Sequence, residues 1–208
     1  MPGMLEGIRV VEMGHVVAIP SSGALLADWG AEVIKLEPLR GEMARGIRRF
    51  LGVETIKRYE GGEVHWLFQP LNRGKKSLAV DLRQERGRAI VYKLIESADV
   101  FLSNYEVGVL EKLGLDYPSL RRVNPKLVYA MLTGYGTVGP DKDERGFDYS
   151  AAWARSGMQY LIGEPGTPPP PQRPGQMDNV AAVHVVAGVL GALLYRNKTG
   201  IGQELQFS

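Results

Sequence analysis

The chain has 208 residues, of which 44% are hydrophobic and 23% charged, a balance typical of a globular protein and not of a disordered chain. It contains no cysteine, which excludes disulfides and thiolate metal sites. The formal net charge is +2, but residues 35–76 hold ten Lys or Arg against five Glu, a local excess of +5. An excess confined to one stretch favours an anionic small molecule, and not nucleic acid, as the partner.

The two ends of the chain and its longest apolar run indicate where in the cell the protein is expected. The opening MPGMLEGIRVVEMG lacks the basic region and apolar stretch of a signal peptide, and residues 181–195 are fewer than the roughly 20 that span a bilayer. We therefore expect a cytoplasmic protein with no membrane partner. The ending GQELQFS resembles a strand in progress, so we expect residues 1–208 to be the N-terminal part of a longer chain.

Strands and helices alternate from the start of the chain. Residues 8–12 form a short β-branched run, residues 20–29 indicate a helix that Gly30 closes, and residues 32–36 indicate a second strand. This βαβ pattern continues, with strands expected at 77–82, 100–102 and 127–132 and a helix at 84–97. The alternation predicts an α/β fold with a doubly wound, mostly parallel sheet, whose ligands bind beyond the carboxyl ends of the strands.

Three stretches carry no clear periodicity: 38–69, 134–145 and 163–176, the last with four consecutive prolines. We expect them to be long irregular loops, which in compact domains are usually functional or mobile.

Asp178 stands between a Gly/Pro-rich loop and an apolar run that ends in Arg196, Lys198 and Gly200, as a helix C-terminus does. The acid therefore lies at a helix N-terminus, where the helix dipole favours the anion. One interpretation is a plain N-cap, worth roughly 1 kcal/mol of stability. The other is a nucleophile that attacks an activated acyl group and forms a mixed anhydride. Spacing alone favours the N-cap.

Four segments in order resemble the class III CoA-transferases, the family of formyl-CoA transferase, carnitine CoA-transferase and, more distantly, 2-methylacyl-CoA racemase. They are LLADWGAEVIKLEPLRGEMAR, LNRGKKSLAVDLRQERGRAIVYKLIESADVFLSNY, LEKLGLDYPSLRRVNPKLVYAMLTGYGTVGP and DNVAAVHVVAGVLGALLYRNKTGIGQ. The resemblance implies the Rossmann-like large domain of that family, without its small domain. It also implies an interlocked homodimer in the full-length form, and it shifts the interpretation of Asp178 to the covalent nucleophile.

By this resemblance, coenzyme A passes from an acyl-CoA to a small free carboxylic acid through an aspartyl intermediate. Coenzyme A is then a substrate and product, and we expect no permanently bound cofactor and no metal. The family's CoA-contacting positions correspond here to Val17, Ala18, Val80, Asp81, Leu82, Arg83, Asn104, Tyr105, Glu106, Lys112, Arg145, Gly146, Phe147 and Asp148. Weaker candidates for phosphate contacts are Arg40, Arg45, Lys75 and Lys76, of which the two lysines are equally well explained as surface charge.

Departures from the family pattern reduce the range of substrates and reactions that we expect. Val17 replaces a substrate-facing glutamine, which disfavours formate and oxalate. Phe147 stands where the racemase branch has a histidine, and a racemase needs that second base. Asp148 remains as a helix cap or a hydrogen-bonding partner in the acyl pocket.

Three alternatives stay open beside the transferase. One is a racemase of the same superfamily. A second is a nicotinamide-dependent dehydrogenase with Glu37 on the ribose, although the first turn, GHVVAIPSSG, is not a GxGxxG motif. The third is a non-catalytic dimerisation fragment built on the small residues of 181–192. The glycine turn TGYGTVGP could donate N–H groups to an oxyanion or be a plain turn, and we expect His184 to be a core histidine.

Overall fold

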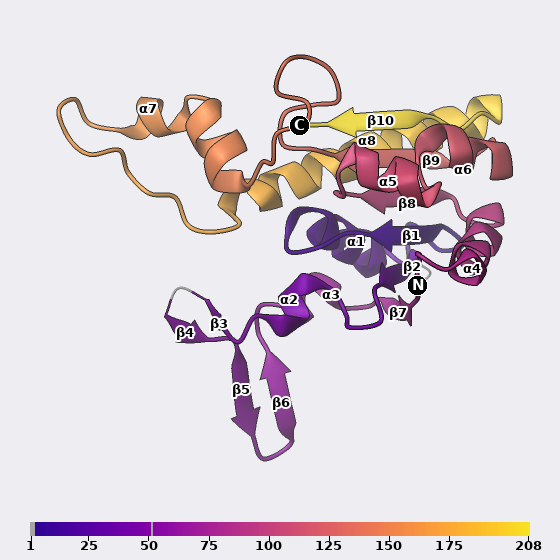
Figure 1. Ribbon diagram of the computed structural model, residues 1–208, viewed down its shortest axis with the longest axis horizontal. Helices are drawn as coiled ribbons and strands as arrows, with labels where there is room; N and C mark the ends of the chain where they lie inside the picture. Colours follow the sequence, from indigo (N-terminus) through magenta and orange to yellow (C-terminus); the bar gives the residue numbers. More distant parts are fainter. Residues whose placement is uncertain (1–2, 51) are drawn as a thin grey trace.

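A six-stranded sheet forms the centre of the computed structural model, which describes residues 3–50 and 52–208 (Figure 1). Every neighbouring pair of strands in it is parallel, as the alternating pattern predicted. In spatial order the strands are β10 (Glu204–Phe207), β9 (Val128–Leu132), β8 (Val100–Ser103), β1 (Arg9–Met13), β2 (Glu32–Glu37) and β7 (Lys76–Ala79).

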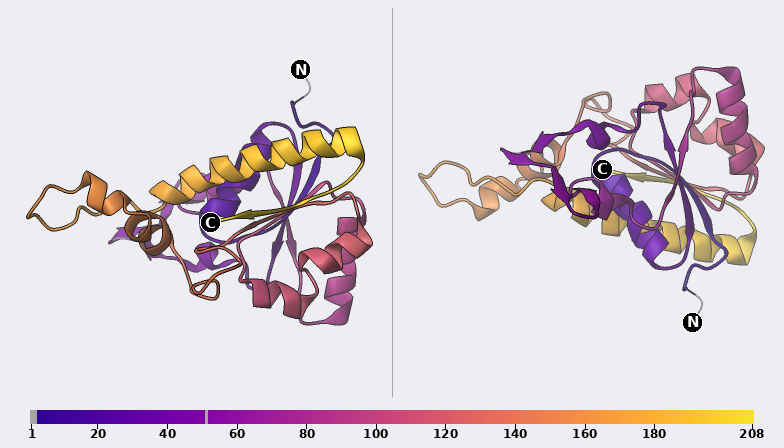
Figure 2. Two further views of the ribbon diagram at one scale, coloured as in Figure 1. Left: turned by 90° about the horizontal axis from the view of Figure 1, so that it is seen from above. Right: turned by 90° about the horizontal axis from the view of Figure 1, so that it is seen from below.

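Helices cover both faces of this sheet. Helices α1 (Ala18–Asp28) and α8 (Gln176–Thr199) pack on one face, and Figure 2 shows α8 lying across that face, with its N-terminal turns extending past the ends of the strands. The other face is covered by α4 (Glu85–Glu96), α5 (Val107–Leu113) and α6 (Tyr117–Val123). The expected doubly wound α/β architecture is therefore confirmed, with element ends shifted by one to three residues.

Strand β1 shows why the core has two halves. Successive side chains of a strand point to opposite faces, so Val10 joins the α1/α8 core and Val11 joins the α4–α6 core. Both valines are fully buried, as expected for a strand inside a parallel sheet.

The prediction that residues 38–69 form an irregular loop is wrong. The chain there forms short elements, and the β5–β6 hairpin projects from the body of the molecule (Figure 1). These elements bury little, so no hydrophobic periodicity marks them in the sequence. They are α2 (Met43–Gly46), β3 (Arg49–Phe50), β4 (Val53–Glu54), β5 (Ile56–Tyr59), β6 (Gly62–His65) and α3 (Gln69–Asn72).

A second projection follows β9. Residues 134–145 contain no helix or strand, as expected, and lead into a π-helix, η1 (Asp148–Arg155), and the short helix α7 (Met158–Ile162). Figure 1 shows these two helices on an arm beyond the carboxyl ends of the strands. The proline-rich return of this arm, also irregular as expected, leads directly into α8.

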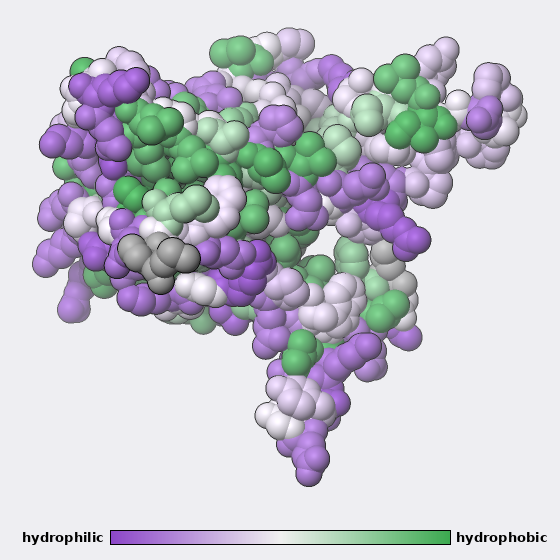
Figure 3. All heavy atoms as spheres, turned by 180° about the vertical axis from the view of Figure 1, so that it is seen from behind, coloured by the Kyte–Doolittle hydropathy of each residue, from purple (hydrophilic) through white to green (hydrophobic). Residues whose placement is uncertain are grey.

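Helix α8 is longer than the apolar run suggested. At 24 residues it is long and apolar enough to cross a membrane by length and composition, so the expectation that it is too short is wrong. Its Val185, Val186 and Val189 are buried in the α1/α8 core, and 33% of the apolar window is buried inside the molecule. Other apolar residues of α8, including Val183 and Leu194, are exposed, and a hydrophobic band lies on this side of the molecule in Figure 3.

A buried ion cluster connects β1, β2 and the segment before β7. The Glu12 carboxylate lies 2.8 Å from the Lys35 ammonium and 2.7 Å from that of Lys75, and all three side chains are almost fully buried. Burial lowers the pKa of Lys75 to about 8 against the attraction of Glu12. Gly23 of α1 packs on this cluster, where a Cβ would lie 1.9 Å from a Glu12 oxygen. Lys75 is therefore neither surface charge nor free to reach a ligand phosphate.

We predict that Glu12→Ala lowers the free energy of unfolding by about 3–5 kcal/mol, because it leaves two buried ammonium groups without their carboxylate. Urea denaturation measures the change. The matched control is Glu32→Ala, which removes a carboxylate one-third exposed in its pairs with Arg9 and Lys76 and should cost about 0–1 kcal/mol. Equal losses in the two variants would contradict the importance of the buried cluster.

Candidate active site

The first turn of α8 begins at Gly175, whose φ of 74° is left-handed and therefore suits glycine. Its N–H donates a 2.7 Å hydrogen bond to the Asp148 carboxylate on the arm. Gly175 is the N-cap, so Asp178 is the third residue of the helix. The interpretation of Asp178 as an N-cap is wrong, although its place in the first helical turn is confirmed.

The Asp178 carboxyl group is partly buried, and among the described residues its side chain forms no hydrogen bond or ion pair. Burial, together with the negative charge of Asp148, raises the pKa of Asp178 from 3.8 to about 6. The expectation that the helix terminus would favour the anion is not met, because the net shift of the pKa is upward; with a pKa of about 6, most of the group is nevertheless ionised at pH 7. An unpaired, weakly solvated carboxylate is a better nucleophile than one held by hydrogen bonds.

The loop after β1 lies against this helix start. A Cβ on Gly175 would lie 3.5 Å from a Val17 methyl group, an ordinary van der Waals distance, so the Val17 side chain packs beside the start of α8. Beside this contact is a hollow of about 160 Å³, lined by Val17, Trp66, Leu67, Pro70, Leu71, Pro174, Gly175 and Asn179. Most of these side chains are apolar, which suits an uncharged part of a ligand.

Asn104 connects the loops after β1 and β8. Its side-chain amide accepts a hydrogen bond from the His15 N–H and donates one to the His15 carbonyl, both at 3.0 Å. Tyr105 packs edge-on against the His15 ring at 5.0 Å between centroids. Burial, followed by the charge of Lys35, lowers the pKa of His15. The family-derived candidates Asn104 and Tyr105 therefore hold the loop that carries Val17.

The predicted CoA-binding cations are exposed, and two of them are paired. Arg83 donates to Asp81 at 2.8 Å, and Arg145 donates to Glu106 at 2.9 Å. The Arg145–Glu106 pair connects the loop before η1 with the loop after β8. Lys112 and Arg40 are also exposed, and neither forms an ion pair within residues 3–50 and 52–208.

The structure does not bring all the candidates together. The Asp148 carboxylate lies close enough to Asp178 to raise its pKa, and Gly146 and Phe147 precede it on the same arm. The set Val80, Asp81, Leu82 and Arg83 follows the edge strand β7, with Val80 buried in the α4–α6 core. Ala18 is also almost fully buried.

The glycine turn after β9 has a packing role. A Cβ on Gly134 would lie 2.6 Å from the Gly146 Cα, so the two backbones pass in close contact there. The Gly136 N–H donates to the Thr133 hydroxyl at 3.0 Å and is occupied. The turn therefore joins the two ends of the loop that leads to Asp148.

Two other sequence interpretations change. His184 is exposed on α8 with its ring nitrogen 2.9 Å from the Val180 carbonyl, so it is not a core histidine. Burial alone would raise the pKa of Glu37, but hydrogen bonds, above all from Arg45, hold it at about 2. With its carboxylate bound to Arg45 and Ser77, Glu37 is not available for the ribose of a nicotinamide cofactor.

Sequence reasoning missed Glu42, which is buried and hydrogen-bonded to the loop after β1. A polar residue in a loop without periodicity gives no sign of burial. The only signal was its position in the block that resembles the transferase family.

The fold and this site define an α/β protein with an unpaired carboxylate where a parallel sheet binds its ligand. The profile of CoA-transferase family III matches residues 5–208, and the chain belongs to that family.

Curated relatives of the chain are also named as CoA-transferases. The chain is 38% identical over 205 residues to an (R)-2-hydroxy-4-methylpentanoate CoA-transferase of Clostridioides difficile, covering 99% of this chain and 50% of that protein. It is also 38% identical over 205 residues to a cinnamoyl-CoA:phenyllactate CoA-transferase of Clostridium sporogenes, covering 99% and 48%. The chain thus spans about half the length of the curated relatives it matches.

Solved structures match the whole fold. A CAIB/BAIF family protein from Brucella suis superposes with a TM-score of 0.90 at 35% identity, covering 99% of this chain and 53% of that one. Rv3272 from M. tuberculosis superposes with a TM-score of 0.88 at 37% identity, covering 100% and 55%.

The raised pKa of Asp178 predicts a stability cost. A carboxyl group whose pKa is higher in the folded than in the unfolded chain destabilises the fold above pH about 6, and the cost is absent below its unfolded value of 3.8. Discounted for partial solvent access, the cost is about 1–2 kcal/mol. Asp178→Asn should therefore be more stable than the parent by about that amount at about pH 8.

Urea denaturation at about pH 8 and pH 4 tests this, and the difference should shrink to about 0.5 kcal/mol or less at the lower pH, which lies close to the unfolded pKa. Asp143→Asn, which changes an exposed aspartate, is the control and should stay within about 0.5 kcal/mol of the parent at both. A stabilisation that persists undiminished at about pH 4 would mean that the ionisation of Asp178 is not its source.

Proposed function

We propose that this chain carries the nucleophile of an enzyme that transfers coenzyme A from an acyl-CoA to a free carboxylic acid. In the first step the Asp178 carboxylate attacks the thioester carbonyl, the C–S bond breaks, and CoA thiolate leaves a mixed anhydride. The thiolate then attacks the Asp178 carbonyl carbon, the anhydride C–O bond breaks, and the donor acid departs. The acceptor carboxylate reverses these steps on the resulting aspartyl-CoA thioester.

One observation carries the proposal: the Asp178 carboxylate is partly desolvated and unpaired among the described residues, in the first turn of α8 beyond the carboxyl ends of the strands. A carboxylate that capped the helix would accept hydrogen bonds from the helix N–H groups. Its raised pKa also makes it a stronger nucleophile than a solvated aspartate, since basicity and nucleophilicity rise together.

The substrate class follows from the hollow beside Val17. Its mostly apolar lining favours an acyl-CoA and an acid with an apolar body over formate or oxalate. Two relatives, named for (R)-2-hydroxy-4-methylpentanoate and for phenyllactate, agree with this choice, whereas others of similar identity are named for succinate, glutarate or L-malate. We also propose that the full-length protein forms the expected interlocked homodimer. The exposed apolar residues of α8 are compatible with such an interface.

We predict that Asp178→Asn abolishes transfer, because an amide cannot form the anhydride. Exchange between isotopically labelled acyl-CoA and a panel of free acids measures activity in the longer chain. Treatment with acyl-CoA and hydroxylamine, followed by peptide mass spectrometry, should place an adduct on Asp178. The control Asp143→Asn should retain parental activity.

The same measurements separate the alternatives. Transfer by Asp178→Asn at more than about one-hundredth of the parental rate, or an adduct on another residue, would contradict the assignment. Release of α-hydrogen from acyl-CoA without an acceptor acid would favour a racemase. A nicotinamide absorbance change would favour a dehydrogenase, and a stable dimer that does not bind CoA would favour an assembly fragment.

The pKa of Asp178 predicts the acidic side of the pH–rate profile. Activity requires the anion, so the rate should fall as pH decreases through about 6. Asp148→Asn keeps an acceptor for the Gly175 N–H but removes the negative charge that helps to raise the pKa. The acidic limb of kcat/KM should therefore move to lower pH in this variant. An unchanged limb would show that the two carboxyl groups are not electrostatically coupled.

A further inference from the structure

The turn that leads from β1 into α1 contains a strained residue. Val16 has a φ of 63°, and it is the one non-glycine residue in the described part of the chain with a positive φ. A β-branched side chain strongly disfavours this left-handed conformation, so other contacts must hold it.

The Glu42 side chain supplies such a contact from a distant part of the chain. The Val16 N–H donates a 3.1 Å hydrogen bond to a Glu42 oxygen. Glu42 is only 3% exposed, and its own N–H donates to the Glu37 carboxylate at 3.0 Å. Glu37 in turn accepts from Arg45 and Ser77, so Glu42 is fixed to β2 and its neighbour β7.

The residue after this strained position reaches the site. Val17 follows Val16 directly, lines the apolar hollow and lies against Gly175 at the start of α8. A change in the Val16 backbone therefore displaces the wall of the hollow next to the turn that carries Asp178. Asn104 holds the preceding residue, His15, from the other side.

We propose that Glu42 is a positioning residue for the transfer reaction, holding the strained Val16 backbone so that Val17 stays in place beside the first turn of α8. This inference rests on the proposed function of Asp178. A misplacement of about 1 Å at a reacting centre can cost about 100-fold in rate, and a shift in one wall of the site should cost less.

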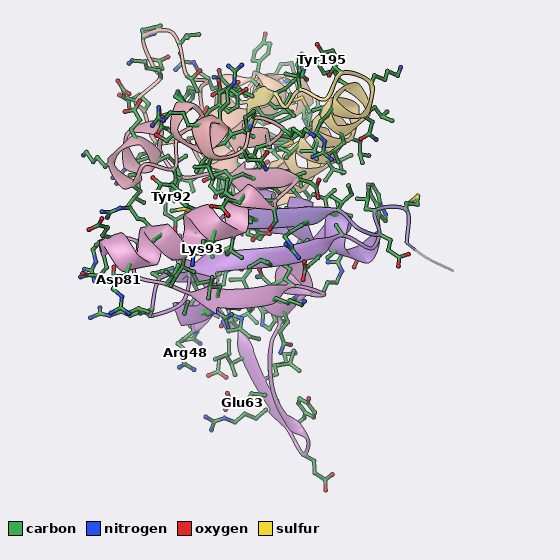
Figure 4. The ribbon with its side chains drawn as sticks, turned by 90° about the vertical axis from the view of Figure 1, so that its right-hand side faces the viewer. Arg48, Glu63, Asp81, Tyr92, Lys93 and Tyr195 are labelled. Atoms are coloured by element: carbon green, nitrogen blue, oxygen red, sulfur yellow. The ribbon has the colours of Figure 1, made fainter. Side chains whose placement is uncertain are left out.

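The test compares Glu42→Ala with Glu42→Gln, in the longer chain with acyl-CoA and hydroxylamine. Glu42→Ala should slow formation of the Asp178 adduct about ten-fold, while the final amount of adduct per protein stays at the parental level. Glu42→Gln keeps an oxygen that accepts from the Val16 N–H and should react within about two-fold of the parent. Glu63→Ala, on the projecting hairpin in Figure 4, is the control for loss of a carboxylate.

A purely structural role for Glu42 gives different results. Loss of folded protein would reduce the final amount of adduct in proportion to the rate, and that result overturns the proposal. So does a Glu42→Ala rate within about two-fold of the parent, or a Glu42→Gln rate as low as that of Glu42→Ala.

A second variant tests the connection through the strained backbone. Glycine adopts the Val16 conformation without steric cost, so in a Val16→Gly background Glu42→Ala should cost about three-fold or less. Fully additive effects would contradict the connection.

Amide hydrogen exchange without substrate separates this proposal from that of the function. Glu42→Ala should increase exchange at the Val16 amide by at least about ten-fold. If the parent forms no Asp178 adduct, the proposed function fails, and unchanged exchange at Val16 overturns the role of Glu42 separately.

Discussion

The hydrogen bond from the Gly175 N–H to the Asp148 carboxylate is the contact on which the site depends. It joins the arm after β9 to Gly175, the N-cap of the long helix, and it fixes where that helix begins. Because Gly175 adopts a left-handed conformation that suits glycine, the chain can turn sharply there, beside the Val17 side chain. The positions of Asp178, the apolar hollow and the second carboxylate all follow from this turn.

Two opposing electrostatic effects meet at Asp178. The positive end of α8 favours the anion, whereas burial and the nearby Asp148 charge disfavour it, and the second pair prevails. The outcome is a carboxylate that is ionised near neutral pH yet poorly stabilised. A carboxylate in this environment lowers the stability of the fold, a common property of functional sites. The buried Glu12–Lys35–Lys75 cluster differs, since each of its charges has an opposite partner.

The parallel sheet could be predicted because its strands are short apolar runs separated by amphipathic helices, and the helix of residues 84–97 has a clear apolar face. The β5–β6 hairpin could not, since most of its side chains are exposed and carry no periodic signal. Lys75 looked like surface charge because a single sequence does not show that Glu12 lies 2.7 Å away. The assignment of Asp178 depended on resemblance, because the spacing of residues favoured a simple helix cap.

The placement of the tryptophans gives the chain an intrinsic optical probe. Trp66 lines the apolar hollow and its indole nitrogen donates to the Glu54 carbonyl, while Trp153 is buried against the proline-rich return of the arm. The third tryptophan, Trp29, follows the C-terminal end of α1 and packs against the α1/α8 core, whereas the hollow lies at the N-terminal end of α1. A ligand that binds in the hollow therefore changes the environment of the Trp66 indole directly. Tryptophan fluorescence can follow that binding without an attached dye.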